Sequence, residues 1–196
     1  MKGFDSFWIQ CVPIKLHLCI STVLFFVSLG IGYIHASLYP EMSQEIFKSL
    51  QNMISEKITD PRPFYVAYSI FFNNVIASFI VIIGGISFGI ISLFGIIFNG
   101  IILGLVISIV KSESSILLIS ILPHGIIELP VFLISSSIGL SLGHQVLNKL
   151  RHKAESNLLK DLKNWLIFYL KWLVPLLLIA AIIEATISMS IVNFLK

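Results

Sequence analysis

Long apolar runs separated by short polar segments dominate the pattern of this chain. The first run extends from Leu16 to Ile34, and the stretch from Phe64 to Val110 contains no charged residue. One straight helix over the second stretch would be roughly 70 Å long, more than twice the ~30 Å hydrocarbon core of a bilayer. It must therefore fold back once, and Gly84-Gly85 offers the flexible backbone that a tight reversal requires.

The whole pattern predicts an all-α fold, a polytopic membrane helical bundle with kinked or broken segments and short amphipathic surface helices. The run from Ile116 to Leu147 would overshoot the bilayer as a straight helix, so we expect kinks at Pro123 and Pro130, and another at Pro175 in the last run. We expect five spans, at about 14–35, 65–83, 86–110, 116–147 and 166–193, with an outer loop at 36–63 and a basic cytoplasmic segment at 148–164.

Composition supports an integral membrane protein made of one domain, residues 1–196. Hydrophobic residues make up 57% and charged residues 12%, whereas soluble domains carry about 25% charged residues.

The first run is longer than the ~7–15 apolar residues of a signal peptide, so an uncleaved span is the preferred interpretation. The net charge of +3 is small and concentrated near one segment, which indicates a topology signal and argues against nucleic-acid binding.

The distribution of Lys and Arg predicts a cytoplasmic amino terminus. With five spans, Lys2, Lys15 and the basic segment lie inside, while the loop 36–63, Lys111 and Lys196 lie outside. Seven Lys and Arg residues are then inside and five outside, in the direction that the positive-inside rule favours. In the basic segment, leucines at four-residue steps predict a helix on the membrane surface, followed by an interfacial belt of Trp165, Tyr169 and Trp172.

The outer loop contains a predicted amphipathic helix that begins near Pro40. Apolar residues recur at helical spacing, and Ile46 and Leu50 belong to this stripe. One interpretation is a helix that lies on the bundle or on lipid. The other is a docking face for a partner protein, because amphipathic helices often serve as such surfaces.

Polar side chains inside the apolar runs are the candidate functional residues. His124 and Glu128 are four residues apart, so they share one face of a helix. Ionisable groups at membrane depth are costly, and a functional role is therefore the default hypothesis. The same intramembrane polar cluster is expected to include Asn73, Asn74, Asn99 and Glu184, although a single amide in a span is more often a link between helices.

Small residues at four-residue spacing predict close helix packing. They form three rows, which are Gly85 with Gly89, Gly100 with Gly104, and Ser135 with Gly139 and Gly143.

Several of these residues together resemble the stage II sporulation protein M family of multipass membrane proteins. The resemblance covers most of the chain after residue 64 and rests on Phe72-Asn73-Asn74, the glycines at 84 and 89, Asn99-Gly100 with Gly104, Pro123-His124-Gly125 with Glu128-Leu129-Pro130, Gly139 with Gly143, and Ile183-Glu184-Ala185. It implies five or six spans. Sporulation members of the family work with peptidoglycan hydrolases during engulfment, and other members accompany circular bacteriocin gene clusters. The His and Glu of this signature look more like the broader family than the sporulation members.

Two classes of function follow. The first is a non-enzymatic membrane scaffold or transport-associated subunit, which recruits peptidoglycan hydrolases or other membrane subunits. The second is an intramembrane site that uses His124, Glu128 and Glu184 to handle a proton, lipid headgroup, metal or small substrate, as a transporter or, in the minor case, an enzyme. We expect no cofactor and no catalytic residues, because the sequence contains no HExxH motif, phosphate-cradling loop or hydrolase triad. Membrane lipids and a second copy of the chain are further expected partners.

Overall fold

The computed structural model describes the chain except residues 1–10, 12–13, 58–61, 114, 152–156 and 195–196. Within the helices, it does not describe the side chains of residues 51, 53–57, 63, 112–126 and 187–194. The long helices are α2 (Lys15–Leu38), α3 (Pro40–Lys57), α4 (Pro63–Ile83), α5 (Ile90–Glu113), α6 (Ser115–Leu150), α7 (Leu158–Phe168) and α8 (Val174–Phe194).

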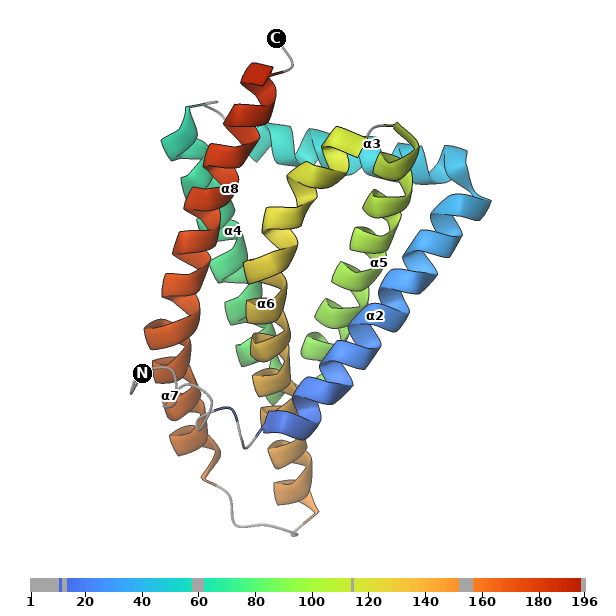
Figure 1. The fold of residues 1–196 in the computed structure, drawn as a ribbon. Coiled ribbons are helices and arrows are strands. Elements are labelled where there is room, and N and C mark those ends of the chain that lie inside the picture. Colours follow the sequence, from blue (N-terminus) through green and yellow to red (C-terminus); the bar gives the residue numbers. More distant parts are fainter. Residues whose placement is uncertain (1–10, 12–13, 58–61, 114, 152–156, 195–196) are drawn as a thin grey trace.

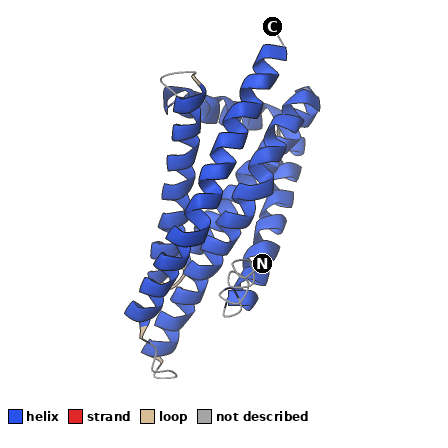
Figure 2. Cartoon of the chain, turned by 60° about the vertical axis from the view of Figure 1, so that its left-hand side comes forward, coloured by secondary structure: helices blue, strands red, loops and turns tan. Residues whose placement is uncertain are grey.

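The described residues confirm the all-α prediction, since they form helices and contain no strand (Figure 2). Within the described ranges, five helical segments are long and apolar enough to cross a membrane, namely Lys15–Leu38, Phe64–Ile86, Ile90–Lys111, Ile127–Leu150 and Leu158–Thr186. Helices satisfy their own backbone hydrogen bonds, which is why apolar runs of this length fold as helices in lipid.

Helix α6 lies at the centre of the bundle and contacts α2, α4, α5 and α8 (Figure 1). Its neighbours α2 and α5 pack closely along one another, whereas α4 and α8 lie on the other side. One core cluster joins α4, α6 and the segment from α7 to the first turn of α8, and includes Ile82, Ile138 and Leu173. A second joins α2, α5 and α6 through Phe25, Ile96 and Leu133.

The reversal between α4 and α5 takes six residues. Residues Gly84–Ile86 form a 3₁₀ turn, and Phe88 and Gly89 follow with φ values of 58° and 78°. Glycine adopts such a left-handed conformation without steric cost. The predicted reversal at Gly84-Gly85 is therefore where this turn begins, and α5 begins at Ile90 rather than at residue 86.

Helix α7 differs from the predicted surface helix. It leads directly through a π-helical segment, Tyr169–Leu173, into α8, so that the three form one rod (Figure 1). Its apolar residues Leu162 and Trp165 pack against the core cluster that α6 contributes to. The apolar face of α7 thus covers protein, and α7 continues the line of α8.

The prolines of α6 and α8 lie in different backbone surroundings. The π-helical segment ends directly before Val174-Pro175, and the Val174 N–H donates to the carbonyl of Tyr169, five residues back. Pro175 has no N–H to donate, and a wider turn accommodates its ring. In α6, by contrast, Pro123 and Pro130 lie within one helix that continues from Ser115 to Leu150.

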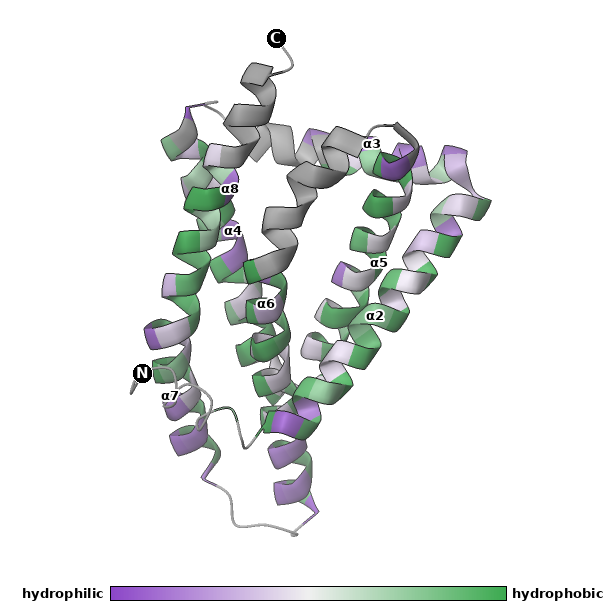
Figure 3. Cartoon of the chain, in the orientation of Figure 1, coloured by the Kyte–Doolittle hydropathy of each residue, from purple (hydrophilic) through white to green (hydrophobic). Residues whose placement is uncertain are grey.

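Polar residues gather at the two ends of the bundle (Figure 3). Helices α2 and α7 begin at one end, where Lys15, Lys149, Arg151 and Lys160 are exposed. Helix α3 crosses the other end, which α8 also reaches. The apolar middle separates these two polar ends, as expected for a membrane-spanning bundle.

Candidate functional site

Glu128 is the buried carboxyl group of the apolar middle. It lies in α6 and is only 4% exposed. Helices α4 and α6 run in the same direction (Figure 1), and the 3₁₀ turn that follows α4 meets α6 where Gly85 contacts Gly139. Asn74 and Glu128 precede these glycines by the same interval, since 85 − 74 = 11 and 139 − 128 = 11. At ~1.5 Å per residue, the two residues lie at a similar depth.

Hydrogen bonds connect α4 to the α7–α8 rod close to the depth of Asn74 and Glu128. The Ser78 hydroxyl donates to the carbonyl of Asn74 over 2.5 Å and lies 3.0 Å from the hydroxyl of Tyr169. The Tyr169 hydroxyl also donates to the carbonyl of Val75 over 2.8 Å. Tyr169 is only 2% exposed, so the prediction that it belongs to the interfacial belt is wrong. Its hydroxyl bonds stabilise the contact between two spans.

The other predicted cluster members lie in different surroundings. Asn73 and Asn99 are exposed, and the Asn99 Nδ2 donates to the Gly95 carbonyl of its own helix over 2.8 Å. Glu184 is half-buried in α8. The side chain of His124 lies outside the described part of the chain. Because one residue turns a helix by about 100°, Asn73 points outward while Asn74 is half-buried.

The predicted small-residue rows lie where backbones approach. A Cβ atom on Gly85 would be 2.1 Å from the Gly139 carbonyl oxygen, and one on Gly104 would be 2.0 Å from the carbonyl oxygen of Leu29. A Cβ atom on Gly143 would be 2.3 Å from the Gly89 backbone nitrogen, and one on Gly100 would be 2.7 Å from the Phe25 carbonyl oxygen. Ser135, in the same row as Gly139, is fully buried. These positions leave no room for larger side chains.

Two polar contacts in the structure were not found by the sequence analysis. The Ser137 hydroxyl donates to that of Ser21 over 3.2 Å inside the bundle. At the end where α2 begins, His17 Nε2 and His144 Nδ1 lie 3.3 Å apart. The partners in each pair are more than 100 residues apart in sequence, so no local spacing could have indicated them. Among the described residues, no three His, Cys, Asp or Glu side chains come together as metal ligands would.

Helix α3 is fixed to the end of the bundle by its apolar face. Ile46 and Phe47 pack against a cluster of Ala36, Leu105 and Ile109 from α2 and α5. Ser43 is fully buried and Leu50 is half-buried. The opposite face is exposed and mainly polar, and comprises Glu41, Met42, Glu45, Lys48, Ser49 and Asn52. The docking role predicted for Ile46 and Leu50 stays a prediction, but Ile46 already uses its apolar surface within the chain.

Comparison with known proteins gives two matches over most of the chain. The family described as Stage II sporulation protein M matches residues 21–189. An uncharacterized protein of the archaeon Methanocaldococcus jannaschii is 30% identical over 185 residues, which cover 92% of this chain and 98% of that protein. No solved structure matches.

Proposed function

Because the chain belongs to the stage II sporulation protein M family, we propose that it is a non-enzymatic multipass membrane scaffold that presents helix α3 to a partner protein. The partner class is a peptidoglycan hydrolase or another membrane subunit. The observation that carries this proposal is the attachment of α3, whose apolar face is packed on the bundle while its polar face is exposed.

The attachment of α3 makes it suitable for presentation. A helix that lay loosely on lipid would have to be ordered when a partner bound, and that ordering would reduce the affinity. Ile46 and Phe47 instead pack against residues of α2 and α5. These two helices are themselves in close backbone contact at Gly32, Gly100 and Gly104. The outward face, which carries Glu45 and Ser49, is therefore held in a preorganised position.

We propose that α3 lies on the outer side of the membrane. The exposed lysines and arginine near the beginnings of α2 and α7 outnumber the exposed basic side chains of Lys48, Arg62 and Lys111 at the opposite end. Positive charge favours the cytoplasmic side. This orientation gives α3 access to partners outside the cytoplasm, as a hydrolase of the cell wall would require.

Photocrosslinking at single positions of α3 tests the proposal in native membranes. A photoreactive residue at Glu45 or Ser49, on the outward face, should yield a crosslink to one distinct protein. The same residue at Phe47, which packs on α5, serves as the matched control and should react within the chain. Glu45→Lys should weaken the crosslink from Ser49 without changing thermal stability. Crosslinks from Glu45 and Ser49 to lipid alone, or only to another copy of this chain, would contradict recruitment of a different protein.

The buried carboxyl of Glu128 favours a second candidate, an intramembrane site that handles a proton or a small substrate. Glu128 is 4% exposed and lies at membrane depth. Ionisable residues in such positions typically serve proton or substrate pathways. Glu128→Gln distinguishes the two candidates, because the amide keeps the size and hydrogen-bonding capacity but cannot release a proton. A folded Glu128→Gln protein that retains the Ser49 crosslink but loses proton-dependent activity in reconstituted vesicles would favour this second candidate.

A further inference from the structure

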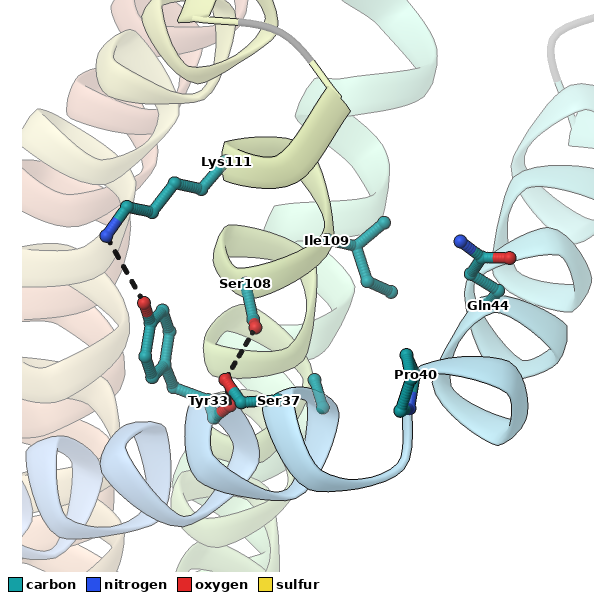
Figure 4. A pocket seen from close by; sticks show the side chains of 8 residues that line it. Tyr33, Ser37, Pro40, Gln44, Ser108, Ile109 and Lys111 are labelled. Atoms are coloured by element: carbon teal, nitrogen blue, oxygen red, sulfur yellow. Dashed lines mark hydrogen bonds between the residues drawn. The ribbon is translucent and has the colours of Figure 1, made fainter.

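A cavity of about 390 Å³ lies where α2 ends, α3 begins and α5 approaches its last turn (Figure 4). Its polar lining comes from Tyr33 and Ser37 of α2, Gln44 of α3, and Ser108 and Lys111 of α5. The cavity is of the size that small-molecule sites in proteins commonly have, about 300–1,000 Å³. None of these residues belongs to the intramembrane polar cluster predicted from the sequence.

The polar groups of the cavity form two hydrogen-bonded pairs. Lys111 Nζ donates to the hydroxyl of Tyr33 over 3.4 Å and lies 6.0 Å from the centre of its ring. The hydroxyls of Ser37 and Ser108 are 3.2 Å apart, and the Ser37 hydroxyl also donates to the Tyr33 carbonyl over 3.0 Å. Figure 4 shows both pairs on the α2 and α5 walls, with Gln44 on α3. Lys111 carries the only charge among the described residues of this lining, so this part of the cavity is suited to an anion.

The position of Lys111 relates the cavity to the membrane surface. It is the first charged residue after the uncharged stretch from Phe64 to Val110, and it lies in the last turn of α5. A lysine at that point extends its ammonium group to the headgroup level. The wall also contains the apolar side chains of Ala36 and Ile109, and Ile34, next to Tyr33 in α2, is 58% exposed. Polar and apolar groups therefore lie side by side at this cavity, as the headgroup and acyl chains of a lipid do.

We propose that this cavity binds the headgroup of an anionic phospholipid. Lys111 would pair with the phosphate through a charge-assisted hydrogen bond, which is stronger than a neutral one. Tyr33, Ser37 and Ser108 supply hydroxyl donors, and Gln44 supplies amide donors for the glycerol or phosphate oxygens. The acyl chains would lie along the exposed apolar side chains of α2. The lipid would thus occupy the junction that holds α3, independently of which partner α3 presents.

Native mass spectrometry of the purified full chain tests the site with phosphatidylglycerol and phosphatidylcholine as probes. The unaltered protein should retain phosphatidylglycerol in preference to phosphatidylcholine. Lys111→Met should lower the apparent affinity for phosphatidylglycerol about fivefold, as expected for one lysine at an anionic membrane surface. Tyr33→Phe, which keeps the ring and removes the hydroxyl, should lower it by a smaller factor. Lys48→Met is the matched control, because it removes an exposed lysine of α3 that does not line the cavity.

Equal thermal midpoints of the variants would show that folding is intact. An unchanged phosphatidylglycerol affinity in Lys111→Met, or an equal loss in Lys48→Met, would overturn the proposal. A titration with inorganic phosphate distinguishes a lipid from a free anion. Binding of inorganic phosphate that depends on Lys111, without retention of phosphatidylglycerol, would also overturn it. If Lys111→Met does not fold, a lowered phosphatidylglycerol affinity in Tyr33→Phe supports the site, and an unchanged affinity refutes it.

Discussion

Replacing Gly104 by alanine should separate α2 from α5. The added Cβ would lie 2.0 Å from the Leu29 carbonyl oxygen and 2.8 Å from the Tyr33 backbone nitrogen. Ordinary contact begins near 3.4 Å, so the backbones must move apart by about 3.4 − 2.0 = 1.4 Å locally. No side-chain rotation can relieve this contact, because both atoms belong to the backbone of α2.

The net cost of Gly104→Ala follows from two opposing contributions. Overpacking of a tight interior typically costs about 1–3 kcal/mol, and a backbone clash falls at the upper end of that range. Alanine in a helix recovers roughly 1 kcal/mol relative to glycine. We therefore expect a net destabilisation of about 1–2 kcal/mol, which corresponds to a fall in Tm of roughly 2–8 °C for a chain of this size.

Gly30→Ala is the matched control, since Gly30 lies in the partner helix α2 and a Cβ there would meet nothing within 4 Å. It gains the helix propensity without the clash, so its Tm should stay level or rise. Thermal unfolding of the detergent-purified protein, followed by tryptophan fluorescence, measures both variants. If Gly104→Ala and Gly30→Ala change Tm equally, the close α2–α5 contact does not determine stability.

Three further outcomes are expected from the structure. In a background without native cysteines, cysteines at Ser49 and Asn157 should be labelled by an impermeant maleimide from opposite sides of the membrane, and labelling of both from one side would refute the five-span topology. Tyr169→Phe should lower the free energy of unfolding by about 1 kcal/mol, because the phenyl ring cannot donate to the Val75 carbonyl; unchanged urea or SDS unfolding would contradict this role. Burial raises the pKa of the Cys11 thiol to about 11, so at pH 8 the reactive thiolate is scarce in the folded protein. With Cys19 replaced by alanine, maleimide should modify Cys11 much more slowly before unfolding in SDS than after it, and equal rates would exclude this protection.

The sequence alone determined the fold class and the number of spans. Uncharged runs such as Phe64 to Val110 leave few alternatives, because a backbone in lipid must satisfy its own hydrogen bonds and a helix does so within each span. The pair Gly84-Gly85 likewise marked where the reversal begins, although the left-handed backbone of the turn lies at Phe88 and Gly89. These features depend on local chemistry and length.

Only the tertiary structure decided which face of each helix is buried. A span that is apolar on every side has almost no periodic signal, so the sequence could not separate buried Glu128 and half-buried Asn74 from exposed Asn73. The apolar stripe of α7 predicted a helix on the membrane surface but packs on the bundle, because lipid and a neighbouring helix both cover apolar surface.

The contact between Lys111 and Tyr33 joins residues 78 positions apart in the chain. It forms because close backbone packing at Gly100 and Gly104 places the end of α5 beside α2. Such a long-range juxtaposition is a property of helix packing, and no local pattern in the sequence encodes it.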